Sequence, residues 1–531
     1  MKLKPLELTL ITLFVVFAVV TGWLLITDIS RETARKKEAN SSQTPVLTGP
    51  SATEKASGST RKRSQNTDNL DPLLARANER LVQFDNDEDY QRFLNSIDSS
   101  NLRLLGSLDS LRAAWLGFDN LSDFDGLLDP DELGHNYLVT LPLLPGQGQV
   151  QAGAVGFGGN ALEWLGITGD NSQWGRDVVV AVVDTGITPH QALPENIQQI
   201  DLVAETGTSE QHGHGTAVAS LIAGTNSLTP GVSPAATLLD IRVADSNGES
   251  NSFMLAQGIT AAVDNGADVI NISLGTYGNS LLVERAVQYA DANGAVIIAS
   301  SGNEGFEQPA FPAGYNEVYA VGAVDREGTL VDFSNTGDTL DITAPGLEVF
   351  AAWTDGRYIE FTGTSASAPY VAAAVATAMS EFQLTASQAA EYVLSFANEA
   401  GSAGTDPSYG EGLLDVGRVI NSTTPNIYDI AAVSNLVETG ESNSLVTIVQ
   451  NQGTETISQG EVSISTPFAE VPLRLSNLAP GEIQTFEVPT SLPQNGEEFF
   501  VTTEATLSGD LQDADPENNI RSTAFDFTTE P

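Results

Sequence analysis

Largely apolar runs alternate with stretches of helical spacing through the middle of the chain. Residues 178–183, 267–273 and 295–300 have the pattern of buried strands, and a helical stretch precedes each of the last two. Strands that are apolar on both faces lie in parallel sheets covered by helices on each side. The pattern therefore predicts a doubly wound, mostly parallel α/β domain over residues 160–422. Its functional groups should follow the carboxyl ends of the strands.

Two regions with other patterns flank this domain. Residues 71–150 combine strand-like runs at 79–84 and 137–141 with helical spacing between positions 90 and 97, which predicts a small α+β unit. After Pro425, short alternating runs are separated by Asn-Gly and Pro-Gly turns. This second pattern predicts a small all-β sandwich over residues 425–531.

The first 70 residues have no globular pattern. Residues 8–26 form a run of 19 uncharged, mostly apolar residues, whereas signal-peptide cores usually have about 7–15 and a bilayer span needs about 20. We interpret residues 1–30 as a signal anchor, with a cleaved signal peptide as the alternative, and residues 31–70 as a flexible linker. The protein should then be extracytoplasmic, either membrane-anchored through this helix or secreted.

Charge and cysteine content exclude several classes of function. The net charge is −46, from 23 Lys+Arg against 69 Asp+Glu, which opposes binding to nucleic acid. It fits a solubilising acidic surface, with a cation-binding surface as the alternative. Cysteine is absent, so disulfides, thiolate metal sites and a cysteine nucleophile are excluded.

Three short segments supply an acid, a base and a nucleophile in that order. A serine hydroxyl needs a base within hydrogen-bond reach, and the base needs a partner that fixes its tautomer. Any one segment alone is more typical of a helix cap or a turn. The Gly-Thr after His214 favours it as the base over His212, while His190 is expected at the rim and His135 in the small N-terminal domain. The segments are Asp184-Thr185-Gly186, His214-Gly215-Thr216 and Gly363-Thr364-Ser365-Ala366-Ser367.

In this order and spacing the segments resemble the active-site blocks of the subtilisin-like serine proteases, the subtilase or peptidase S8 family. The resemblance implies that Ser365 is the nucleophile, His214 the general base and Asp184 the group that orients His214. It also implies that Asn303, in Ser301-Gly302-Asn303-Glu304-Gly305, donates to the oxyanion together with the serine backbone N–H.

The same resemblance implies a substrate groove. The backbone of residues 271–275 should pair with an extended substrate. Small uncharged walls predict a preference for apolar or medium side chains. One wall is expected from Ser273, Leu274 and Gly275, and the opposite wall from Ala299, Ser300 and Ser301.

The chemistry itself implies no cofactor, but a structural calcium ion stays open. The segment 223–232 is short where many family members carry a calcium-binding loop. An acidic turn offers other ligands, although such turns are usually only solvated; its residues are Asp513, Asp515 and Asn518.

The two flanking regions also resemble known protein modules. Residues 71–150 resemble the family's propeptide, which templates folding and then inhibits the enzyme by occupying its cleft; a generic small domain is the alternative. The processed chain should start between residues 147 and 160. Residues 425–531 resemble the immunoglobulin-like adhesion modules of bacterial surface proteins.

Together these expectations describe a serine endopeptidase, made as a secreted or membrane-anchored precursor, that hydrolyses peptide bonds through an acyl-enzyme. Its partners should be protein or peptide substrates and its own propeptide as an intramolecular inhibitor. Two alternatives stay open: a catalytically silent surface adhesion protein, and a peptide ligase or cyclase on the same residues.

Overall fold

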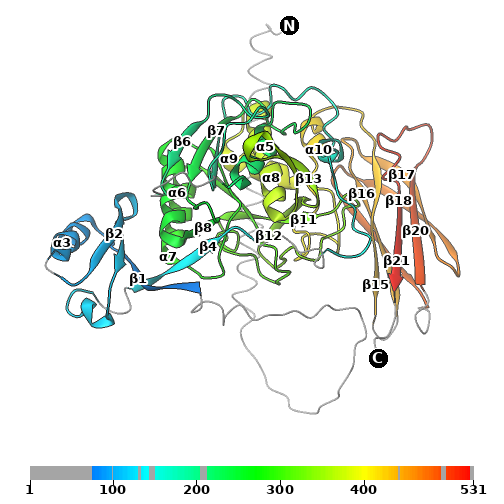
Figure 1. Cartoon of the computed structure of the whole chain (residues 1–531). Coiled ribbons are helices and arrows are strands. Elements are labelled where there is room, and N and C mark those ends of the chain that lie inside the picture. Colours follow the sequence, from blue (N-terminus) through cyan, green and yellow to red (C-terminus); the bar gives the residue numbers. More distant parts are fainter. Residues whose placement is uncertain are drawn as a thin grey trace, which may run out of the picture. The chain divides into compact units, whose positions relative to one another are not determined.

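The computed structural model describes residues 74–98, 100–128, 133–142, 150–203, 212–439, 443–491 and 498–526 (Figure 1). The predicted signal anchor (1–30) and linker (31–70) lie outside these residues. Within the described ranges, no helix is both long and apolar enough to cross a membrane.

A seven-stranded parallel sheet forms the centre of the catalytic domain, in the order β12-β11-β10-β9-β5-β7-β6. The three strands predicted from apolar runs are present as β5, β9 and β10, so the doubly wound α/β prediction is confirmed. The strands are β5 (Val179–Asp184), β6 (Gln198–Asp201), β7 (Thr237–Arg242), β9 (Val269–Ile272), β10 (Val296–Ser300), β11 (Val318–Val324) and β12 (Leu340–Pro345).

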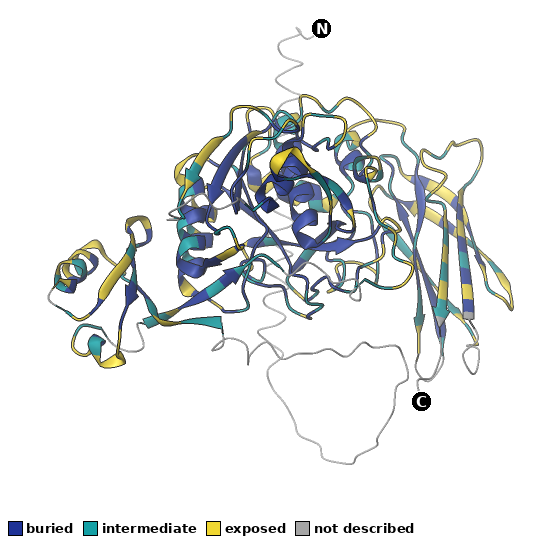
Figure 2. Cartoon of the chain, viewed as in Figure 1, coloured by how far each residue is buried: buried dark blue, intermediate teal, exposed yellow. Residues whose placement is uncertain are grey.

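Helices cover both faces of this sheet because alternate side chains of each strand point to opposite faces. On β5, Val180 and Val182 join the core that contains α5 (His214–Ala223) and α8 (Thr364–Phe382). Ala181 and Val183 join the core on the other face. Figure 2 shows the sheet and the two central helices as buried. The remaining helices are α4 (Ala161–Trp164), α6 (Ser252–Asp264), α7 (Leu281–Ala292), α9 (Ala386–Ser395) and α10 (Val416–Asn421).

The strand order places a switch point between β5 and β9. From β5 the chain proceeds to β6 and β7 on one side, then returns to β9 and continues through β10 to β12 on the other. Loops at the carboxyl ends diverge at such a point and leave a crevice between them. Asp184 ends β5, and Ser273 follows β9 directly.

The small N-terminal domain has the predicted α+β composition. Its four antiparallel strands lie in the order β2-β3-β1-β4, with one capped helix and a separate apolar core. At the β4 edge the sheet continues into β8 (Glu249–Asn251) of the catalytic domain. The elements are β1 (Ala75–Gln83), α3 (Asp87–Ile97), β2 (Arg103–Leu108), η2 (Asp109–Leu111), β3 (Ala113–Gly117), η3 (Leu121–Phe124) and β4 (Leu133–Thr140).

Residues 150–158 are built into the catalytic domain rather than into the small one. The side chain of Gln151 donates to the carbonyl of Leu330 and accepts from the backbone of Asp332. Phe157 N–H donates to the carbonyl of Leu347, and Phe157 is buried. The folded catalytic domain therefore begins at about residue 150, ten residues earlier than predicted.

The C-terminal region consists of two antiparallel sheets, ordered β15-β16-β19 and β18-β17-β20-β21, around one apolar core. The strands are β15 (Ile430–Glu438), β16 (Ser444–Asn451), β17 (Ile457–Ser465), β18 (Glu470–Leu478), β19 (Ile483–Pro489), β20 (Glu498–Leu507) and β21 (Ile520–Asp526). The catalytic domain also carries a two-stranded hairpin, made of β13 (Val349–Ala352), η5 (Thr354–Gly356) and β14 (Tyr358–Phe361).

A half-buried arginine joins the sandwich to the catalytic domain. Arg418 on α10 donates through Nη1 to the carbonyls of Phe396 (3.1 Å) and Ala397 (2.9 Å), and through Nε to the carbonyl of Gln452 in the sandwich (3.1 Å). The half-buried Asp415 beside it supplies an opposing charge. Without the guanidinium, the three carbonyls lose their charged hydrogen-bond donor.

We therefore expect Arg418→Met to lower the free energy of unfolding by about 1–3 kcal/mol, measured by guanidinium denaturation in a Ser365→Ala chain that cannot digest itself. Arg521→Met removes an exposed contact to the carbonyl of Glu327 and serves as the control, with an expected change within about 0.5 kcal/mol. Equal stabilities for the two variants would contradict the role given to Arg418.

Candidate active site

The centre of the site is a short hydrogen bond between a strand end and a helix start. Asp184, fully buried at the end of β5, accepts from His214 Nδ1, which lies 2.9 Å from each carboxylate oxygen. The backbone N–H of Thr185 donates to the same carboxylate at 2.7 Å. A proton on Nδ1 makes Nε2 the acceptor on the far side of the ring.

The residues after His214 explain why the helix can come this close. A Cβ at Gly215 would lie 2.6 Å from the carbonyl oxygen of Gly186, so only glycine fits against the loop that follows Asp184. Thr216 Oγ1 then accepts from the backbone N–H of Thr188, in the same loop, at 2.9 Å. The Gly-Thr pair that favoured His214 in the sequence is thus the contact between α5 and the loop after Asp184.

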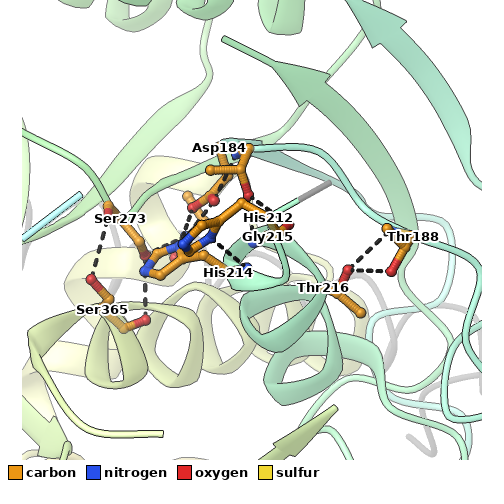
Figure 3. A network of polar contacts seen from close by, with 10 residues as sticks. Asp184, Thr188, His212, His214, Gly215, Thr216, Ser273 and Ser365 are labelled. Carbon is orange, nitrogen blue, oxygen red and sulfur yellow. Dashed lines mark hydrogen bonds and ion pairs between the residues drawn. The ribbon is translucent and has the colours of Figure 1, made fainter. Parts of the chain in front are cut away.

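Ser365 lies in the first turn of α8 and is buried. Figure 3 shows its side chain next to the His214 ring, with Asp184 beyond the ring. Its hydroxyl donates to the carbonyl of Ser273 at 3.2 Å, and the Ser273 hydroxyl donates to the carbonyl of Ser365 at 3.4 Å. Pro369 has no N–H for the Ser365 carbonyl, so Ser273 partners an acceptor that an ordinary helix would satisfy itself.

Asn303 follows β10 and faces the start of α8. Its Oδ1 accepts from both the backbone N–H and the hydroxyl of Thr364, each at 2.9 Å, which fixes the orientation of the amide. Gly363 has φ +136°, and a Cβ there would lie 2.7 Å from Asn303 Nδ2. The donating end of the amide is therefore held beside the backbone that leads into Ser365.

The two predicted pocket walls do lie side by side. Because β9 and β10 are parallel neighbours with Ile272 opposite Ala299, the segments that follow them leave the sheet at the same edge. The walls' members Ser273, Leu274, Ala299, Ser300 and Ser301 are all buried.

The second wall continues into a charged residue that the sequence prediction missed. Glu304 Oε2 accepts from the Asn303 backbone N–H at 2.9 Å and from the Tyr277 hydroxyl. Burial, and then the nearby Glu304 charge, raises the pKa of Tyr277, so this hydroxyl stays protonated. Glu304 directly follows Asn303 in the motif, and that adjacency was the available signal.

The edge at residues 271–275, where we expected an extended substrate to pair, is hydrogen-bonded to the end of the small domain. Thr140 exchanges two backbone hydrogen bonds with Gly275, at 3.0 and 2.9 Å, and Leu141 N–H donates to the carbonyl of Gly248 at 3.1 Å. On its other side, β4 pairs with β8, and Val139 lies opposite Ser250. The end of the small domain thus lies as a middle strand between two edges, of which the sequence predicted only residues 271–275.

The calcium candidates are engaged in local structure. Asn226 Oδ1 accepts from the backbone of Leu228 and Thr229 and closes the short turn after α5. Asp513 accepts from the N–H groups of Ile430 and Asp515, so it caps a turn. Across the described ranges, no three His, Asp or Glu side chains cluster as metal ligands.

Comparison with known proteins agrees with this geometry. Residues 175–412 match the model of the subtilase family, Peptidase_S8. The chain is 36% identical over 249 residues to the thermostable alkaline protease of Halalkalibacterium halodurans, covering 46% of this chain and 68% of that protein. It is 35% identical over 250 residues to subtilisin DY of Bacillus licheniformis, and 36% over 243 residues to subtilisin Savinase of Lederbergia lenta, covering 90% of each and 46% and 45% of this chain.

The fold and the comparisons together define a serine-type endopeptidase. The chain belongs to the subtilase family, as the sequence segments indicated.

Thr364 provides a test of the amide orientation. Thr364→Val keeps the shape but removes the hydroxyl that donates to Asn303 and accepts from Gly302. We expect kcat on a peptide substrate to fall about 10-fold with KM nearly unchanged, because only transition-state stabilisation is lost. Thr364→Ser should retain activity, and an unchanged kcat for Thr364→Val would contradict the orienting role.

Proposed function

We propose that this protein hydrolyses peptide bonds through an acyl-enzyme on Ser365. The observation that carries the proposal is the buried hydrogen bond between Asp184 and His214, beside which Ser365 lies (Figure 3). It supplies the two requirements of an activated serine, a base with a fixed tautomer and a hydroxyl next to it.

In the first step His214 Nε2 takes the proton of the Ser365 hydroxyl while the oxygen attacks the substrate carbonyl. The imidazolium that forms is stabilised by the Asp184 carboxylate 2.9 Å from Nδ1. The oxyanion receives hydrogen bonds from Asn303 Nδ2 and the Ser365 backbone N–H at the start of α8, where the helix dipole also favours negative charge.

In the second step the carbon–nitrogen bond breaks, and His214 returns the proton to the leaving amine. Water then enters, gives a proton to His214 and attacks the acyl carbonyl. When the ester bond to Ser365 breaks, His214 returns that proton to the Ser365 oxygen, and the carboxylic acid is released. Every proton passes through His214, and no cofactor takes part in this scheme.

Residues 75–142 serve, in this proposal, as an intramolecular inhibitor. Residues 138–141 fill the groove as an extended strand bonded on both sides, the arrangement that a peptide substrate would use. A substrate chain needs the same edges at Gly275 and Gly248, so both cannot be bound at once.

The groove and the core together limit the processing site. The chain up to Leu141 is held in the groove, and from about residue 150 it is bonded into the catalytic domain. Cleavage between residues 142 and 150 would separate the two parts and keep the contacts that Gln151 and Phe157 make within the catalytic domain. This proposal moves the interval toward the N-terminus, so that it overlaps the 147–160 expected from the sequence only at residues 147–150.

We expect N-terminal sequencing of the purified protein to give a first residue between 143 and 150. The Ser365→Ala variant cannot form the acyl-enzyme and should keep the upstream segment, because the protein processes itself. Identical N-termini in both would contradict self-processing, and a start after residue 150 would contradict the domain boundary.

A fluorophosphonate probe tests the nucleophile itself. The wild type should carry one adduct, mapped by mass spectrometry to Ser365, whereas Ser365→Ala should carry none and lose about 10⁶ in kcat. Ser367→Ala is the matched control: Ser367 lies on the same helix as Ser365, but its hydroxyl donates to the carbonyl of Pro345 at the end of β12, so the variant should label like the wild type. A wild type that does not label would favour a catalytically silent scaffold.

The terminal regions complete the proposal. Counted along the sandwich, the strand order is 1-2-5 in one sheet and 4-3-6-7 in the other, which supports an immunoglobulin-like assignment for residues 425–531. The uncharged run at residues 8–26 supports placement outside the cytoplasm, as a membrane-anchored or secreted precursor.

A further inference from the structure

The first histidine of the His-Gly-His segment is hydrogen-bonded both to the start of α5 and to the loop after Asp184. His212 lies two residues before His214, and its Nδ1 accepts from the His214 backbone N–H at 3.2 Å. Its carbonyl accepts from the Thr185 hydroxyl at 3.2 Å, next to Asp184. Its ring packs edge-on against Trp353, with centroids 5.5 Å apart, and lies 6.2 Å from the His214 ring (Figure 3).

The hydrogen bond from the His214 backbone N–H determines which nitrogen of the His212 ring carries the proton. A backbone N–H only donates, so Nδ1 of His212 must be an unprotonated acceptor and the ring proton must sit on Nε2. A second proton could enter only at Nδ1, where it would meet the N–H and break this bond. Helix α5 begins at His214 with Gly213 before it, and Gly213 has no side chain that could replace the cap.

The surroundings of His212 act on its pKa in both directions. Burial, and then the proximity of His214 on α5, lowers the pKa of His212; Asp184 on β5 and Asp245 in the turn after β7 act in the opposite direction with smaller effect. The β13–β14 hairpin contributes only the uncharged Trp353 to this contact. Burial and the nearby His214 therefore favour the neutral His212 ring that its hydrogen bond to the His214 N–H requires.

We propose that His212 is a positioning residue for His214, whose neutral ring holds the first N–H of α5 and whose protonation switches the catalytic base off. The inference rests on the proposed function, because it assigns a task to His214. A charged His212 would release the helix start and place a second cation beside the imidazolium that catalysis must form. Loss of activity at low pH should then involve two protons rather than one.

The pH profile separates this role from a merely structural one. Each group that must be unprotonated adds about one unit to the acid-side slope of log(kcat/KM). We expect a slope that approaches about 2 in the wild type. His212→Asn should give a slope of about 1, because Asn can accept the same N–H two residues ahead but does not titrate. At pH 8 its kcat/KM should stay within about twofold of the wild type.

His212→Ala removes both the cap and the titration, so it should give a slope of about 1 with kcat/KM at pH 8 lowered about 10-fold. The chain offers a matched control in His190, whose Nδ1 accepts from Ala192 N–H at 3.1 Å in the same local pattern but whose Nε2 meets the carbonyl of Arg357. His190→Asn should leave the slope unchanged. A slope of about 2 in His212→Asn, or equal rates for His212→Asn and His212→Ala, would overturn the proposal.

A second measurement does not depend on activity. The chain has only 4 histidines, so the imidazole signals of a ¹⁵N-histidine-labelled Ser365→Ala chain can be assigned by single substitutions. We expect His212 as the Nε2–H tautomer with an accepting Nδ1. An Nδ1–H tautomer would overturn the positioning role even if the protease is active. If the wild type has the expected tautomer but no protease activity, the proposed function and the protonation switch are refuted. Only the role of His212 as a cap of α5 would then be retained.

Discussion

The hydrogen bond between the Asp184 carboxylate and His214 Nδ1 is the contact on which the rest of the site depends. It joins the end of a central strand to the first residue of a central helix, and both groups are almost fully removed from solvent. A buried carboxylate is costly unless its lone pairs are used, and here Thr185 and His214 use them. Gly215 is the residue that lets the two elements approach closely enough for this bond.

The same crevice explains how the flanking domains relate to the chemistry. The switch point between β5 and β9 brings Asp184 and Ser273 to one edge, and the groove beside it holds the last strand of the small domain. The sandwich attaches elsewhere, through Arg418 and Gln452. One neighbour thus lies in the groove that we propose for the substrate, whereas the other is attached through Arg418, outside the residues of that groove.

Much of this was predictable from the sequence. Apolar periodicity gives β5, β9 and β10, and the Gly-Thr and Gly-Thr-Ser contexts single out His214 and Ser365, because these local patterns reflect local physical needs. The pairing of Leu138 with Asn251, the hydroxyl of Tyr277 on Glu304 and the docking of Arg418 were not predictable. Each joins positions far apart in the chain, so only the folded backbone brings them together. The bond from His214 N–H to His212 is local, but its meaning depends on Asp184 and Trp353 nearby.

The most direct measurement of the central claim is proton NMR of the His214 Nδ1–H in the Ser365→Ala chain. The account predicts an exchange-protected resonance well downfield of the amide region, because this proton is buried and shared with a carboxylate. It should vanish in Asp184→Asn and persist in His190→Asn. A spectrum without this resonance, or one in which Asp184→Asn leaves it unchanged, would contradict the account.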